Sequence, residues 1–140
     1  MKKITAIAAS LLAAACASGG GGSEGIVDFS AQLSPTTGNQ VSGSANAVTA
    51  VGETAVTIEI ENGSPGARHP WHVHTGTCGN AGPPVGGGSN YPVLEVDGDG
   101  EIRAVATIPV ELEDDAQYVV NVHQSPQAMG TIISCGPLVD

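Results

Sequence analysis

Three of the four histidines in this chain lie within six residues, in the segment His69-Pro70-Trp71-His72-Val73-His74. Side chains on a β-strand alternate between its two faces, so an extended segment here places His72 and His74 on one face and Trp71 and Val73 on the other, in a core. Two imidazoles on the same face lie about 7 Å apart along the strand and can bind one ion. Because imidazole suits copper and zinc, this spacing predicts a transition-metal site.

The fourth histidine, His123, ends a second strand-like segment, Tyr118-Val119-Val120-Asn121-Val122-His123. If the two segments lie side by side, His123 adds a third nitrogen donor to His72 and His74. Bonds of about 2.0–2.1 Å to one ion require the three donor nitrogens to converge within about 4 Å of one another. His69 has the strand parity of Trp71, so we expect it to be structural. The alternative is that the histidines are hydrogen-bonded residues of a site that binds no metal.

The first 15 residues have the pattern of a secretory signal peptide. Lys2 and Lys3 precede an apolar run, residues 4–15, that is too short to span a bilayer. The small residues 13–15 directly before Cys16 resemble a bacterial lipoprotein cleavage box, which implies cleavage before Cys16 and acylation of its thiol and amine. Ordinary secretion is the alternative.

The Gly/Ser-rich residues 16–23 predict a flexible tether, and residues 24–140 are enough for one domain. No Asp follows Cys16, so the lipoprotein resemblance implies anchoring at the outer membrane, facing the periplasm or the cell surface. The lipid on Cys16 would be the membrane contact, and the sequence indicates no particular protein partner.

The charge of the predicted mature chain is strongly negative. Without residues 1–15 the fixed cations are Arg68 and Arg103, and two arginines against 14 acidic residues give a formal net charge of −12. Such a charge argues against nucleic acid and anionic surfaces as partners. No Ser-His-Asp set, paired carboxylate or phosphate-binding glycine motif stands out, so no catalytic residue is predicted.

Once Cys16 is set aside, Cys78 and Cys135 remain as an even pair in an exported protein. A disulfide between them is the expected state. It would close a loop of roughly 57 residues, which is worth about 4 kcal/mol on the chain-entropy model.

Short strand-like segments separated by turn residues fill the domain. We expect strands at residues 26–33, 41–51, 54–61, 69–74, 91–96, 101–110, 117–123 and 131–138. Residues 75–90 predict a long irregular loop, and residues 97–100 a tight turn that pairs its two flanking strands as a hairpin. Seven or eight strands at this spacing predict an all-β fold, either a β-sandwich or a Greek-key barrel.

These features together resemble the copper/zinc superoxide dismutase family. His72-Val73-His74 matches the H-x-H strand that supplies two copper ligands in that family, and residues 119–123 match a strand that supplies another. Cys78 and Ser134-Cys135-Gly136 match its disulfide between a loop and the last strand. His69 matches a structural histidine. The resemblance implies that family's fold and one copper ion held by His72, His74 and His123.

The departures from the family pattern concern zinc and the substrate. No histidine lies between His74 and His123, so the bridging histidine and the zinc histidines are missing and no zinc site is expected. Ile132 stands where the family has an arginine that attracts the anionic substrate, and a net charge of −12 would repel superoxide.

Three functions are therefore open: copper binding with weak superoxide or other redox chemistry, copper buffering or delivery, and a non-catalytic structural or interaction module that kept the fold and lost the metal. A weaker resemblance to bacterial chordin-repeat-type domains gives a competing family.

Overall fold

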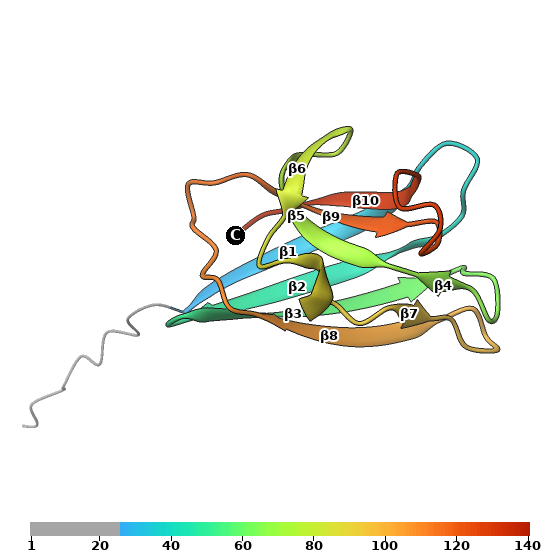
Figure 1. The fold of residues 1–140 in the computed structure, drawn as a ribbon, viewed down its shortest axis with the longest axis horizontal. Coiled ribbons are helices and arrows are strands. Elements are labelled where there is room, and N and C mark those ends of the chain that lie inside the picture. The colour runs from blue at the N-terminus through green and yellow to red at the C-terminus, as the bar shows by residue number, and fades with distance from the viewer. Residues whose placement is uncertain (1–25) are drawn as a thin grey trace, which may run out of the picture.

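The computed structural model describes residues 26–140 (Figure 1). The predicted signal peptide and the tether with Cys16 lie outside the described residues. The all-β fold expected from the sequence is confirmed. The elements are β1 (Val27–Pro35), β2 (Ser42–Ala50), β3 (Glu53–Glu61), β4 (Arg68–His69), β5 (Trp71–Thr77), β6 (Asn80–Pro84), η1 (Gly88–Asn90), β7 (Leu94–Glu95), β8 (Ile102–Ile108), β9 (Tyr118–His123) and β10 (Ile132–Leu138). Within residues 26–140, no helix has the length and apolar character that a bilayer crossing requires.

Eight strands form one antiparallel sheet in the order β6-β5-β9-β10-β1-β2-β3-β8. Successive strands of this sheet are not neighbours at three places, after β3, after β6 and after β8, and β10 returns beside β1, as in Greek-key folds. The sheet curls on itself, so that β5 passes across β1 and β2 in the view of Figure 1. Buried side chains from both halves then form one hydrophobic cluster. The fold is thus a curled sheet with its core inside.

Strand alternation places the core residues as the sequence predicts. Val56 and Ile58 on β3 are fully buried and their neighbours Ala55 and Glu59 are exposed. On β5, Trp71 and Val73 are buried in the same cluster. The indole N–H of Trp71 donates a hydrogen bond to the Pro92 carbonyl at 2.8 Å, so the largest core side chain has no unpaired polar atom.

The expected hairpin between residues 91–96 and 101–110 is wrong. The turn itself forms, because the Gly100 N–H donates to the Asp97 carbonyl, but β7 pairs with β4 in a separate two-stranded sheet. β8 instead pairs with β3 from Thr54↔Ile108 to Ile60↔Ile102. That register buries Ala106 and Ile108 in the core. Pairing of β8 with the two-residue strand β7 could not bury as much apolar surface.

The expected irregular loop at residues 75–90 is wrong in part. β5 continues to Thr77 and the chain reverses into β6, which pairs with it. The reversal depends on Gly76 and Gly79, whose φ angles of 99° and 84° suit glycine. The expected strand 69–74 is divided at Pro70, whose missing N–H interrupts a ladder.

The predicted disulfide between Cys78 and Cys135 is confirmed, with 6.0 Å between the two Cα atoms. Cys78 lies in the turn between β5 and β6, and Cys135 lies on β10. The bond therefore fixes that turn against a strand that is not its neighbour in the sheet.

Candidate metal centre

β9 is buried along both of its faces. In a curled antiparallel sheet one face packs in the core and the other usually meets water. All six residues of β9 are buried, as are the first four of β5, which lies beside it. Val120 and Val122 belong to the core cluster, whereas Asn121 and His123 alternate to the opposite face. Over β9 and the first part of β5, the outer face of the sheet is therefore closed to solvent, and it carries polar side chains.

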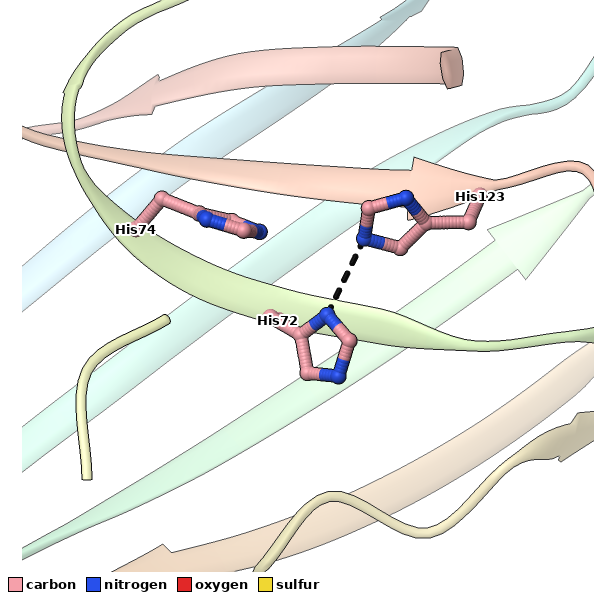
Figure 2. A group of neighbouring side chains, drawn as sticks. All are labelled: His72, His74 and His123. Atoms are coloured by element: carbon pink, nitrogen blue, oxygen red, sulfur yellow. Dashed lines mark hydrogen bonds between the residues drawn. The ribbon is translucent and has the colours of Figure 1, made fainter. Parts of the chain in front are cut away.

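Three histidines come together on this outer face. His72 and His74 project from β5 and His123 from the end of β9, with their rings turned toward one another (Figure 2). The side chains are 7%, 8% and 4% exposed. One donor nitrogen from each lies within 4.8 Å of the other two. The prediction that these three residues converge is confirmed.

The spacing is slightly wider than a bound ion requires. Two nitrogens bonded to one ion at about 2.1 Å can be at most about 4.2 Å apart. The donor nitrogens lie up to 4.8 Å apart, so the distance between them must shorten by up to about 0.6 Å when an ion binds. Rotation of an imidazole ring about its χ2 angle covers such a distance, since that torsion is broad.

Backbone carbonyls fix two of the three rings. The Nδ1–H of His74 donates to the Gly82 carbonyl at 2.8 Å, and the Nδ1–H of His123 donates to the Met129 carbonyl at 2.6 Å. A neutral imidazole carries one proton, so both Nε2 atoms carry lone pairs. Such bonds are typical of metal-binding histidines, because they orient the ring and set the ligand nitrogen.

The third ring uses its other nitrogen. His72 Nδ1 lies 3.0 Å from His123 Nε2 (Figure 2). Since His123 Nε2 has no proton, His72 is the donor in this hydrogen bond. His72 therefore faces the group with Nδ1, and ligation through that atom would require its proton to move to Nε2.

One of the three donor atoms has no partner. Among the described residues, the buried side-chain nitrogen and oxygen atoms without a hydrogen bond are His74 Nε2 and Asn121 Oδ1. A buried polar atom left unpaired costs about 1–3 kcal/mol, and most such atoms in proteins are satisfied. A metal ion between the three rings would satisfy His74 Nε2.

The group is covered closely on the side of His72. A Cβ atom at Gly88 would lie 3.1 Å from His72 Nε2, so the loop at η1 approaches the ring more closely than most side chains permit. The rings of Tyr91 and His72 pack edge to face with 5.2 Å between their centroids, and the Tyr91 hydroxyl donates to the Val85 carbonyl. This cover limits the freedom of the His72 ring.

Two of the histidines, His72 and His123, are held in their neutral form at pH 7. Burial, with repulsion from His123 and His74, lowers the pKa of His72 to about 4. Burial also lowers the pKa of His123, against the opposing effect of its hydrogen bond to Met129. Metal ions bind the neutral imidazole, so at this pH a metal need not displace a proton from a charged ring of His72 or His123.

His69 lies beside the group but does not join it. Its Nδ1–H is shared between the carbonyls of His123, at 3.1 Å, and Gln124, at 2.8 Å. These bonds hold the end of β9 where His123 projects. The contacts are those expected of the structural histidine.

The two arginines of the domain are both paired at the surface. Arg68 contacts Glu95 at 3.3 Å and Arg103 contacts Glu59 at 2.9 Å, and all four side chains are more than half exposed. Arg68 is close to the histidines in sequence, but its charge is offset by Glu95. In residues 26–140, no arginine is left to attract an anion.

Sequence reasoning missed Asn121 and the carbonyl groups of Gly82 and Met129. Asn121 could have been found, because it has the strand parity of His123 and interrupts a run of valines. The two carbonyls carry no sequence signal, since any residue supplies one.

The lowered pKa of His72 predicts a pH dependence for the metal-free protein. Between about pH 6.5 and pH 4 the unfolded chain binds a proton at this residue and the folded chain does not, so stability falls as the pH falls. Carboxylate groups also titrate in acid and change the stability of both proteins. The quantity to follow is therefore the difference in free energy of unfolding between wild type and His72→Gln. Urea denaturation with a chelator present should show wild type losing stability relative to the variant on acidification. A constant difference would contradict the lowered pKa.

No protein-family model matches this chain, and no curated protein matches its sequence. What can be said of the chain's chemistry therefore follows from its own residues: a buried group of three histidines, placed closely enough to hold a metal ion, on a disulfide-linked all-β fold.

Proposed function

We propose that this protein is an exported lipoprotein that binds one copper ion through His72, His74 and His123, and that it holds or delivers copper in preference to turning over superoxide. The observation that carries the proposal is His74 Nε2, a buried nitrogen with no hydrogen-bond partner that faces two further imidazole donors. Bound copper would supply one-electron redox chemistry at this position.

The donor set supports copper over other divalent metals. It consists of three imidazoles, and the two cysteines of the described residues are bonded to each other and cannot act as thiolates. Nitrogen donors suit copper and zinc, and affinity rises along the first-row series to a maximum at copper. The three ligands lie on two adjacent strands, which fix their positions relative to one another.

The surface charge supports a role in holding copper. Thirteen of the 14 acidic residues lie in the described part of the chain, and both of its arginines are paired. Such a field attracts a cation and repels a small anion such as superoxide. The chain resembles superoxide dismutases in the pattern of its histidines. Its negative surface charge, however, argues against efficient turnover of superoxide.

An extracytoplasmic location is supported by two independent features. The first is the signal-like segment with Cys16, and the second is the Cys78–Cys135 disulfide, which persists in oxidising compartments. Anchoring through a lipid on Cys16 at the outer membrane belongs to the same proposal.

Metal content of the purified protein tests the copper site. After stripping with a chelator and reloading, wild type should hold one copper per chain, measured by mass spectrometry of the metal. His72→Ala and His123→Ala each remove a ligand and should weaken binding by roughly 100-fold or more, beyond the range seen for residues that only orient ligands.

His69→Gln is the matched control, since it removes a buried histidine that does not join the group, while its side-chain amide keeps an N–H donor for the carbonyls of His123 and Gln124. It should keep its copper, with circular dichroism confirming that every variant is folded. If wild type takes up no copper, or if both ligand variants keep theirs, the site is not a copper site and a non-catalytic module becomes the better description.

The copper-loaded protein should consume superoxide slowly, and the rate should rise with added salt. Salt screens the repulsion between the acidic surface and the anion, with a Debye length of about 10 Å at 0.1 M. Pulse radiolysis over a series of ionic strengths measures this dependence. A fast rate that falls with salt would indicate attraction of the anion and an efficient dismutase.

A further inference from the structure

We infer that Asn121 supplies a fourth donor to the metal, through its side-chain oxygen Oδ1. The inference rests on the proposed copper site and adds a ligand to it. An amide oxygen beside three imidazoles gives the mixed nitrogen and oxygen set that Cu(II) accepts.

The first observation is the state of Oδ1 itself. Asn121 is 4% exposed, and Oδ1 is one of the two buried side-chain atoms in residues 26–140 that lack a hydrogen bond. The other is His74 Nε2, an atom of the histidine group. Both atoms offer lone pairs, and both lie on the outer face of the same two strands.

The second observation is the place of Asn121 in the sheet. It pairs in register with His72 on β5 and with Cys135 on β10, and it precedes His123 by two residues on β9. Opposite residues on antiparallel strands have Cβ atoms about 4.5–5.5 Å apart. His72 and Asn121 thus face each other across the strand pair, with His74 and His123 at the two diagonal positions.

Within residues 26–140, the imidazole N–H groups of the three histidines and the backbone N–H groups of β9 are all directed to acceptors other than Oδ1. The Nδ1–H groups of His74 and His123 are used by the carbonyls of Gly82 and Met129, and that of His72 is directed at His123. The Cys135 sulfur is in the disulfide. The backbone N–H groups of β9 are used by ladders to β5 and β10 on its two sides. A cation held by the histidines would accept a lone pair from this oxygen and so supply the partner that it lacks.

The test compares Asn121→Leu, which keeps the shape and removes the oxygen, with Asn121→Asp, which keeps an oxygen donor. Loss of the donor should weaken copper binding about tenfold in the Leu variant, the lower end of the range for residues that support a metal ligand set. The electron paramagnetic resonance spectrum of its Cu(II) form should change. The metal-free Leu variant should melt at a higher temperature than wild type, because an unpaired buried amide is removed. The Asp variant should bind copper more tightly than wild type, because its carboxylate brings a negative charge to the cation, and the spectrum of its Cu(II) form should change.

The outcomes separate the two proposals. If wild type binds copper and the Leu variant has the same affinity and spectrum, Asn121 is not a ligand and the three-histidine site stands. If the metal-free Leu variant only loses stability, with copper binding unchanged, the residue is structural. If wild type binds no copper, both proposals fail. Should the Leu variant not fold, the Asp variant decides: an unchanged affinity and spectrum would overturn the assignment.

Discussion

The centre depends on an imbalance between lone pairs and protons on one buried face. His74 Nε2, His123 Nε2 and Asn121 Oδ1 all offer lone pairs there, and the one N–H directed among them is that of His72. In water such an imbalance costs little, because solvent supplies the missing donors. Behind a closed cover each unpaired atom is costly. A positive ion compensates for several lone pairs at once, and the rest of the structure can be understood as holding that face closed.

The fold closes the face from three directions. The β5–β6 hairpin supplies the carbonyl that orients His74, the loop after β9 supplies the carbonyl that orients His123, and Gly88 lets the η1 loop lie against His72. The disulfide fastens the turn of that hairpin to β10. The same burial that hides the histidines keeps His72 and His123 neutral, so the closure of the face also prepares these two rings to bind a metal. The acidic surface outside then favours a cation over an anion as the group that reaches the site.

Strand alternation explains how much of this could be predicted. The two-residue period alone predicts that His72 and His74 share a face and that Trp71 and Val73 enter the core, and both hold in the structure. The arrival of His123 could be expected only from the family resemblance, because pairing of β5 with β9 is non-local. The pairing of β8 with β3 in place of β7 was missed for the same reason: turn residues indicate where the chain reverses, and burial decides which strands then pair. Asn121 was missed because its significance depends on which donors are already used around it.

Nuclear magnetic resonance of the histidine ring nitrogens in the Cu(I)-loaded protein tests the central claim most directly, since Cu(I) is diamagnetic and each of the six nitrogens of these three rings can be assigned. The geometry predicts that His72 changes at Nδ1, with its proton moving to Nε2, and that His74 and His123 change at Nε2 while their Nδ1–H bonds to Gly82 and Met129 persist. Ring nitrogens that do not respond to the metal, or a response through the opposite nitrogens, would contradict it.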